Sequence, residues 1–333
     1  MPQSPVELEK QLDFSMGAHS TDHTMTRRFV LLAPMALAGA VSIASRGAPL
    51  GFCIGTYGMK DLPIDAALRL IARTGYDGVE LSLMPEWQCD PAKMSGGDRR
   101  RLRVLLGETR LALAALNEAL LITAESRTRN LERLRLAADL AHYLAPGAPP
   151  VIETMLGGKT AEWATSKHGI VDELGSWAQL AERHDVTLCF KPHAGHAIHN
   201  PARALETLRL VGSQRLKICY DYCHMFVASE SLESSLRALA PHLGFITLKD
   251  ARWTDTGHQF LLPGDGDTDY PLYFRLLKEL GYRGWVAAEV TAMIWRKPGY
   301  DPAAAARTAY TNISPFWKAA GIERPTRTAV GAE

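Results

Sequence analysis

Short apolar runs alternate with longer amphipathic segments from residue 49 onward. Segments such as 127–144 and 269–281 carry apolar residues at spacings of three and four, which is typical of helices that cover a core. Regular alternation of buried strands with such helices predicts a parallel α/β sheet. The eight strand candidates begin at Gly51, Gly78, Leu111, Pro150, Val186, Leu216, Gly244 and Trp285.

Eight successive strand–helix units indicate a closed (β/α)8 TIM barrel rather than an open dinucleotide-binding sheet. The sequence contains no G-x-G-x-x-G and no G-x-x-x-x-G-K-[ST]. Nicotinamide cofactors and nucleoside triphosphates are therefore not expected. We assign residues 48–322 to a single TIM-barrel domain, 1–47 to an N-terminal extension and 323–333 to a flexible tail.

The N-terminal extension is typical of an export signal. Arg27 and Arg28 precede the apolar run LLAPMALAGAVSIA, which ends at Ala44. A basic start, an apolar centre and small residues near the end predict cleavage by a signal peptidase. The paired arginines indicate the twin-arginine route. The run is short for a membrane span, so we expect an exported, periplasmic bacterial protein that has no membrane anchor after signal removal.

Charge and cysteine content narrow the choice of partners. Lys and Arg number 37 against 36 Asp and Glu, so the chain has no basic field that would attract nucleic acid. The five cysteines are an odd number, and several lie in apolar runs. They are predicted to be small buried side chains rather than disulfide partners. A homo-oligomer is left open by the sequence.

Polar side chains concentrate at the ends of the last five predicted strands. In a TIM barrel the carboxyl ends of the strands form the active site, so these residues are expected to converge. Carboxylates that face one another repel and take up protons unless a cation lies between them. The residues concerned are Glu153 on the fourth strand, Lys191 and His193 on the fifth, Asp221 and His224 on the sixth, Lys249 after the seventh, and Glu289 on the eighth.

Two arrangements would satisfy these carboxylates. The first is a divalent metal, Mn2+, Co2+ or Zn2+, because carboxylate and imidazole groups suit borderline cations. The second is an ion-pair network in which Lys191 and Lys249 neutralise the acidic groups. The residue types favour the metal for Asp221 and Glu289 and leave the other two candidates open. The candidate ligands are Glu153, His193, Asp221 and Glu289.

Aromatic side chains near the strand ends are candidates for stacking on a sugar ring. Packing in the barrel is the alternative for each of them. We select Trp253 as a substrate-binding residue. The aromatic candidates are Tyr57, Trp87, Tyr222, Trp253 and Trp295. The loop after the seventh predicted strand has the sequence FLLPGDGDTDY. Its residues Asp267 and Asp269 are predicted to form a turn and a helix cap.

Taken together, these motifs resemble the sugar phosphate isomerase/epimerase group of xylose isomerase-like barrels, over nearly the whole mature chain. The resemblance rests on IGTYGMKDLPIDAALRLIARTGYDGVELSL, the D-x-x-H of Asp221 and His224, the LKD and PGDG segments and the final EV. It implies a metal held by Glu, Asp, His and Glu on strands five to eight. Asp221 and Glu289 match two of these ligands, and His224 matches a substrate-binding histidine.

The other two ligand positions depart from the family pattern. Lys191 stands at the strand-five glutamate and Thr247 at the strand-seven histidine. An ammonium group in place of an anionic ligand weakens a metal site. The site is therefore either rebuilt with Glu153 and His193 or empty. Lys191 itself is expected either to act as a base, if its pKa is lowered, or to neutralise an enediolate.

The resemblance implies a metal-assisted isomerase or epimerase that removes a proton next to a carbonyl of a sugar or keto-sugar. One alternative is a lyase or dehydratase acting on a related keto-sugar or glycoside. Another is a non-catalytic carbohydrate-binding barrel that has lost its metal. The predicted catalytic residues are Lys191, Glu153 and Glu289, and the predicted substrate-binding residues are His224, His193, Lys249 and Trp253. Export favours an unphosphorylated small-molecule carbohydrate as the substrate.

Overall fold

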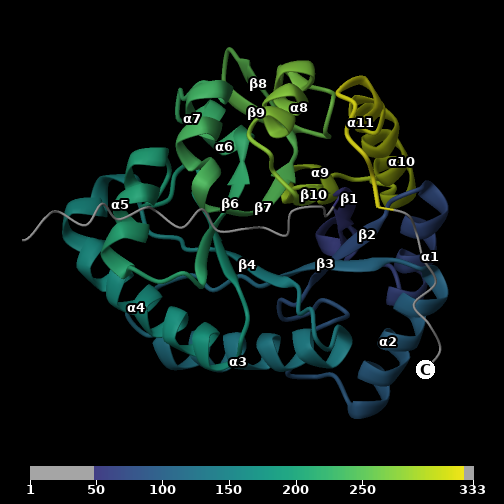
Figure 1. Cartoon of the computed structure of the whole chain (residues 1–333), viewed down its shortest axis with the longest axis horizontal. Coiled ribbons are helices and arrows are strands. Elements are labelled where there is room, and N and C mark those ends of the chain that lie inside the picture. The colour runs from purple at the N-terminus through teal and green to yellow at the C-terminus, as the bar shows by residue number, and fades with distance from the viewer. Residues whose placement is uncertain (1–48, 326–333) are drawn as a thin grey trace, which may run out of the picture. The chain divides into compact units, whose positions relative to one another are not determined.

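A computed structural model describes residues 49–325. Its centre is a closed barrel of eight parallel strands in the order β1-β10-β7-β6-β5-β4-β3-β2 (Figure 1). Each barrel strand overlaps one of the eight predicted apolar runs, so the TIM-barrel prediction is confirmed. The barrel strands are β1 (Leu50–Gly55), β2 (Gly78–Ser82), β3 (Ala112–Asn117), β4 (Val151–Met155), β5 (Leu188–Lys191), β6 (Leu216–Asp221), β7 (Leu243–Leu248) and β10 (Gly284–Ala288).

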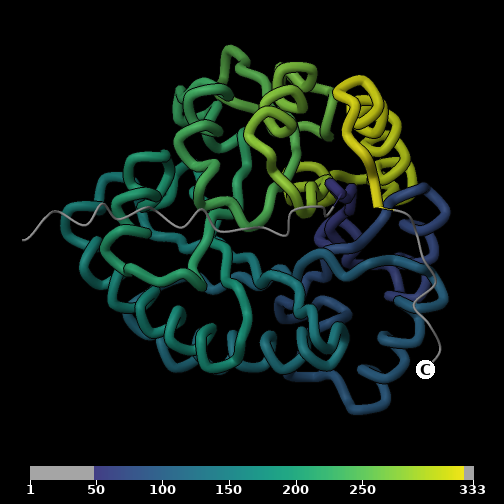
Figure 2. The backbone as a smooth tube through the Cα atoms, viewed as in Figure 1, coloured from purple at the N-terminus to yellow at the C-terminus, as the bar shows by residue number. Residues whose placement is uncertain are grey.

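Helices surround the strands, as the ribbon and the backbone tube both show (Figures 1 and 2). They are α1 (Ile64–Thr74), α2 (Gly96–Thr109), α3 (Arg127–Leu144), α4 (Trp163–Arg183), α5 (Pro201–Val211), α6 (Tyr222–Val227), α7 (Leu232–Leu239), α8 (Tyr270–Glu279), α9 (Ala292–Trp295), α10 (Pro302–Ile313) and α11 (Pro315–Ala319). Three short 3-10 turns, at Thr56–Met59, Thr160–Glu162 and Ala240–His242, join strands to helices.

Local sequence signals explain where the helices begin and end. α5 starts after Asn200, whose side chain accepts a hydrogen bond from the Arg203 amide, and it stops at Gly212 in the left-handed conformation. The last predicted helix, 301–321, is divided into α10 and α11. Pro315 opens the second helix because proline has no N–H to donate and is suited to a first helical position.

An antiparallel hairpin follows β7 and was not predicted. It consists of β8 (Asp250–Thr254) and β9 (Gly257–Leu261), which pair with each other outside the barrel. Its solvent-exposed positions are largely polar, so no buried run marks it in the sequence. The buried Asp250 accepts hydrogen bonds from the Gly264 and Thr268 amides and fastens the following loop to the hairpin. As predicted, Asp269 caps α8 through the Leu272 amide.

The part of the barrel interior that lies away from the carboxyl ends of the strands, called the lower part here, is apolar and buried. Phe245 and the small side chains Cys53, Cys189 and Cys219 form one buried cluster, against which Trp285 packs. A methyl group on Gly51 would overlap the Trp285 indole, so glycine makes room for this ring. All five cysteines are free and buried, which confirms their prediction as small core residues.

Contacts at the end of the barrel domain reach beyond residue 322. The Leu50 amide donates to the Glu323 carbonyl, and Arg324 forms two hydrogen bonds with Asp77, at 2.8 and 2.9 Å. The predicted export signal, including Arg27 and Arg28, and residues 326–333 lie outside the described residues. Within residues 49–325, no helix is long and apolar enough to cross a membrane.

Removing the Arg324 side chain is predicted to destabilise the barrel. Asp77 is 6% exposed, and Arg324→Ala leaves it without its charged partner. A lost hydrogen bond to a buried charge costs about 2 kcal/mol, which denaturant unfolding would measure. Arg69→Ala is the control, because Arg69 and its partner Glu108 are each about half exposed and such pairs contribute less than about 1 kcal/mol. Equal losses in the two variants would contradict the prediction.

Candidate active site

The upper part of the barrel interior, at the carboxyl ends of the strands, is charged. Alternate residues of a strand point to the same face, so the inward positions that continue from the apolar cluster run to the strand ends. On β5, Lys191 follows the cluster residue Cys189 by two positions. Asp221 ends β6, and Glu289 comes directly after β10. The strand ends therefore bring these predicted residues together at the mouth of the barrel.

Lys191 lies among three carboxylates. Its Nζ atom is 2.7 Å from Glu289 Oε2, 3.8 Å from Asp221 Oδ2 and 3.9 Å from Glu153 Oε2. Lys191, Glu153 and Asp221 are each at most 4% exposed, and the side chain of Glu289 is 14% exposed. Glu289 is therefore the member of this group that solvent or a ligand reaches most directly.

Lys249 supplies a second buried cation. Its Nζ atom donates to Asp221 Oδ2, to Glu289 Oε1 at 3.3 Å and to His224 Nε2 at 3.1 Å. It also lies 5.2 Å from the ring centre of Phe260 on the hairpin, within the range of a cation–π contact. Two ammonium groups and three carboxylates thus form one buried ion-pair network, which is the alternative to a metal that the sequence left open.

The network shifts the pKa values of its members in opposite directions. Burial lowers the pKa of Lys191, but the Glu153 and Glu289 carboxylates outweigh burial and hold it well above its ordinary value. Burial raises the pKa of Glu289, but the two lysines outweigh it and hold the pKa far below its usual range. Lys191 is therefore an ammonium group at neutral pH. This direction opposes the predicted role of Lys191 as a base and leaves its role in neutralising an enediolate.

Glu80 on β2 belongs to the site and was missed by the sequence analysis. It is 1% exposed, and burial raises its pKa well above the ordinary value, with the charge of Glu153 adding to the effect. It hydrogen-bonds to Glu153, whose pKa burial also raises. Because one carboxyl must donate, Glu80 is the protonated partner of this pair. An acidic residue at an inward position of an apolar strand, two after Gly78, was the signal available in the sequence.

Two further contacts orient the carboxyl pair. Asn117, at the end of β3, donates its side-chain amide to Glu153 Oε1. A methyl group on Gly55 would lie 2.5 Å from Glu80 Oε2, so the absence of a side chain on β1 leaves room for this carboxyl. The other oxygen of Glu80, Oε1, is buried and has no hydrogen-bond partner among the described residues. One polar atom of the acid is thus available to a ligand.

Three histidines form a stack beside the network. The His193 ring centre lies 3.6 Å from that of His224 and 4.1 Å from that of His196. Burial, together with His196 and Lys249, lowers the pKa of His193 to about 3, so this ring is neutral. Since Lys249 can only donate, His224 Nε2 accepts and its Nδ1 carries the proton. That Nδ1 atom is buried without a partner in the part of the chain that is described.

Aromatic side chains border the network on two sides. Tyr57 stacks on Trp87 at 5.3 Å and meets the edge of Trp295 at 5.6 Å. Burial raises the pKa of the Tyr57 hydroxyl, and the negative charge of Glu289 raises it further. On the hairpin, Trp253 is half exposed and lies 6.2 Å from Phe226. Trp253 is thus available to a ligand, and its predicted contact with a sugar stays a prediction.

The observed arrangement of these side chains does not suit a divalent metal. Lys191 Nζ lies within 4 Å of all three carboxylates, so an ion bound among them would stand close to an ammonium group. At an effective dielectric constant of 20, a divalent ion and an ammonium 4 Å apart repel by about 8 kcal/mol. His193 stacks on the other histidines, and its Nδ1 lies 2.8 Å from the Ala194 carbonyl. Within residues 49–325, no three acidic, histidine or cysteine side chains form a metal-binding group.

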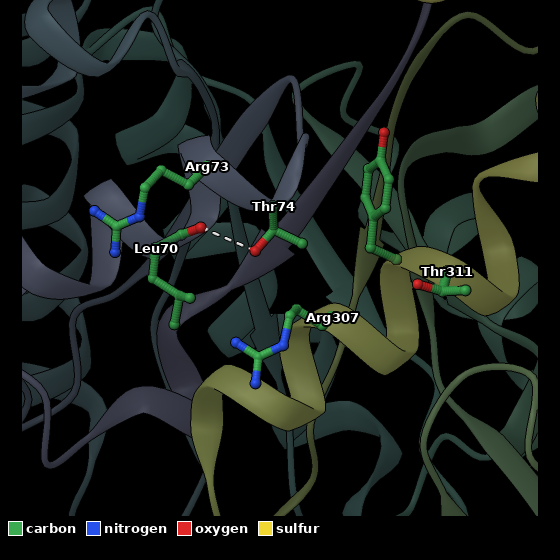
Figure 3. A pocket seen from close by; sticks show the side chains of 6 residues that line it. Leu70, Arg73, Thr74, Arg307 and Thr311 are labelled. Atoms are coloured by element: carbon green, nitrogen blue, oxygen red, sulfur yellow. Dashed lines mark hydrogen bonds between the residues drawn. The ribbon is translucent and has the colours of Figure 1, made fainter.

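A separate hollow of about 480 Å³ lies outside the barrel, between α1 and α10. Figure 3 shows Arg73 and Arg307 extending at its edge. The Thr74 hydroxyl donates a hydrogen bond to the Leu70 carbonyl, 2.9 Å away. None of its lining residues belongs to the buried network. The candidate active site is therefore the interior network and not this surface hollow.

The protonated state of Glu80 has a measurable consequence for stability. An unfolded glutamate has a pKa of about 4.3, and the folded value is raised. Folding must therefore keep a proton that the unfolded chain releases, and stability is lost as the pH rises from about 4.3 through the folded pKa. Glu80→Gln, which keeps a donor to Glu153, is predicted to have a higher melting temperature than wild type at pH 7, with the difference vanishing near pH 4.

The exposed Glu108→Gln serves as the control for that experiment, because Glu108 is about half exposed and pairs with a surface arginine. Its melting temperature should follow that of wild type across the same pH range. A Glu80→Gln variant that is less stable than wild type by the same amount at pH 4 and pH 7 would show that Glu80 is ionised in the folded protein.

Comparisons with known proteins agree with this fold. Fructoselysine 3-epimerase of Escherichia coli O157:H7 is 23% identical over 262 residues, covering 73% of this chain and 91% of the relative. Inosose dehydratase of Mesomycoplasma hyopneumoniae is 27% identical over 135 residues, covering 36% of this chain and 44% of the relative. The apo structure of 3-keto-D-glucoside 4-epimerase from E. coli superposes with a TM-score of 0.62 at 17% identity, covering 80% and 99% of the two chains.

The family model described as xylose isomerase-like TIM barrel matches residues 68–311. This stretch runs from α1 to α10 and contains Glu80, Glu153, Lys191, Asp221 and Glu289. The characterised relatives are enzymes, epimerases and dehydratases. The chain belongs to the xylose isomerase-like TIM barrel family.

Proposed function

We propose that this protein is a sugar epimerase or isomerase. It removes a proton from a carbon next to the carbonyl of a keto-sugar and returns it, passing through an enediolate. Membership of a family whose characterised relatives are epimerases and dehydratases supports this class of reaction. The observation that carries it is the buried network at the strand ends, which places cations and carboxyl groups of unlike acidity side by side.

The carboxyl groups divide into two kinds. Glu289 stays ionised because two lysines stabilise its charge. Glu80 and Glu153 have raised pKa values, which makes them better proton carriers near neutral pH. Groups whose pKa values are driven apart by their surroundings are typical of acid–base pairs. We assign the proton transfer to Glu153, and the protonated Glu80 beside it donates a hydrogen bond to it. We assign Glu289 to binding a substrate hydroxyl at the mouth of the barrel.

The lysine charges complete the reaction chemistry. An enediolate carries negative charge on the former carbonyl oxygen, and an ordered cation stabilises this charge most when it is shielded from water. Lys191 and Lys249 are each at most 4% exposed and remain charged. His224 and His193, both neutral beside them, are suited to binding sugar hydroxyls. Trp253 is proposed to stack on the ring of the substrate.

A divalent ion, Mn2+, Co2+ or Zn2+, was predicted to polarise the carbonyl. Neither the arrangement around Lys191 nor the position of His193 suits this ion, so no step of the proposed reaction runs through it. The observed positions of the side chains therefore do not support the predicted set of metal ligands, Glu153, His193, Asp221 and Glu289. The chemistry assigned to the chain's own residues does not require the ion.

Dehydration is the second candidate reaction, because inosose dehydratases are among the relatives. It begins with the same proton removal and ends with loss of a hydroxyl group, which a neutral carboxyl such as Glu80 is able to protonate.

Export of the folded protein through the twin-arginine signal is also proposed, supported by Arg27, Arg28 and the apolar run after them. It favours unphosphorylated keto-sugars or keto-glycosides as substrates.

The test is proton exchange in heavy water. Purified protein is incubated with a panel of unphosphorylated ketoses and 3-keto-glycosides in D2O, and NMR follows deuterium entry next to the carbonyl and any new epimer. We expect Glu153→Gln to lower the exchange rate by about 10²-fold or more, since general base catalysis contributes roughly 10²- to 10⁴-fold. Formation of an unsaturated ketone instead of an epimer would assign the dehydratase reaction.

The surface variant Glu206→Gln is the control, because Glu206 pairs with Lys167 away from the barrel mouth. It should exchange protons at the wild-type rate. Binding of a sugar without exchange in wild type would assign the non-catalytic carbohydrate-binding alternative. Full activity in Glu153→Gln would overturn the role given to Glu153.

A further inference from the structure

The position of Lys191 is unusual among the charged groups of the barrel. Its Nζ atom stands within 4 Å of carboxylate oxygens from β4, β6 and the end of β10. These three strands lie on different sides of the closed barrel. A single cationic centre therefore joins acidic groups that face one another across the interior, which is the place where a bound cation would be expected.

The two buried lysines differ in how their N–H groups are used. Lys249 has three donors, and all three are taken by Asp221, Glu289 and His224. Lys191 also has three donors, but within residues 49–325 it forms one hydrogen bond of normal length, to Glu289 at 2.7 Å. Its distances to Glu153 and Asp221, 3.9 and 3.8 Å, are too long for direct hydrogen bonds. Lys191 therefore has donors left for a ligand oxygen, and Lys249 has none.

We propose that the Lys191 ammonium group permanently takes the position and the electrostatic role of a divalent cation, so that this barrel works without a bound metal ion. Lys249 acts as a positioning residue, because it holds Asp221 and Glu289 in place around Lys191.

Charge balance supports this assignment. Glu153, Asp221 and Glu289 are the three acids around Lys191, and the two ammonium groups offset most of their charge. The Lys191 Nζ atom lies within 4 Å of an oxygen of each of these acids, where an ion bound among them would have to lie. A metal ion would have to displace a charge that its own ligands stabilise.

The consequence for the ligand concerns geometry. Lys191 uses one of its three N–H groups on Glu289 and offers the remaining N–H groups to substrate oxygen at hydrogen-bond distance. We infer that the carbonyl oxygen of the substrate is bound by Lys191 and that its neighbouring hydroxyl is bound by Glu289. This part of the inference rests on the proposed function. The absence of metal binding does not rest on it.

The test measures metal binding directly on the full-length wild-type protein. The protein is dialysed against EDTA and then titrated separately with Mn2+, Co2+ and Zn2+. Metal content is read by inductively coupled plasma mass spectrometry and stability by thermal unfolding. We expect no saturable uptake of Mn2+, Co2+ or Zn2+ at one ion per chain, and a melting temperature that neither EDTA nor these ions change. Tight uptake of one ion with a rise in melting temperature overturns the proposal.

Lys191→Met provides the reciprocal test, because it keeps an unbranched side chain, one atom shorter than lysine, and removes the charge. Three carboxylates then face one another around an uncharged group, and we expect this variant to gain saturable Mn2+ or Co2+ binding and a melting temperature that rises with the ion. Lys167→Met is the matched control, since Lys167 contacts the single carboxylate of Glu206 at 2.8 Å. It should gain no such binding.

A folded Lys191→Met variant that takes up no metal contradicts the claim that Lys191 holds the cation position. If this variant does not fold, the wild-type titration still decides the question in either direction. Failure of the proposed function has a separate signature, namely wild-type protein that exchanges no proton with any ketose. That result would leave the metal titration unaffected, so the two failures are distinguishable.

Discussion

Neutralisation of buried carboxylates is the constraint on which this site depends. The barrel interior holds three acidic side chains at the strand ends, above a buried cluster of apolar side chains. They are Glu153, Asp221 and Glu289. Buried like charges repel strongly at low dielectric, so they require a cation between them. Lys191 is that cation, and Lys249 supports it. Removing either ammonium would leave acidic groups that must take up protons or bind another cation.

The barrel architecture makes this concentration of charge possible. Each strand contributes one or two inward positions near its carboxyl end, and the helices outside the barrel pack their apolar side chains against the strands in one large buried cluster. Trp285, Phe245 and three cysteines fill the lower interior, so the charged side chains lie directly above a packed apolar layer. The hairpin after β7 then brings Phe260 against Lys249 and covers one side of the network.

The relatives include an epimerase and a dehydratase, and the reaction proposed for this chain is proton removal next to a carbonyl. In the proposed reaction, the Lys191 ammonium group stabilises the negative charge that develops on the substrate. An ammonium group is weaker than a divalent ion as an electrophile, but it is fixed in place by the carboxylates around it and needs no reorganisation when charge develops. The neutral Glu80 and the ionised Glu289 both interact with the Lys191 charge, which gives the site both an acid and an anion.

The sequence by itself determined the barrel, because strand–helix alternation and hydrophobic periodicity are local signals, and all eight strands overlap their predicted runs. It also identified Lys191, Glu153, Asp221 and Glu289, since charged residues at the ends of apolar strands are conspicuous. Only the tertiary structure shows the ion-pair network around Lys191, because the network depends on distances between strands far apart in the chain. The role of Glu80 and the hairpin after β7 were likewise undetermined, because neither leaves a distinct local pattern.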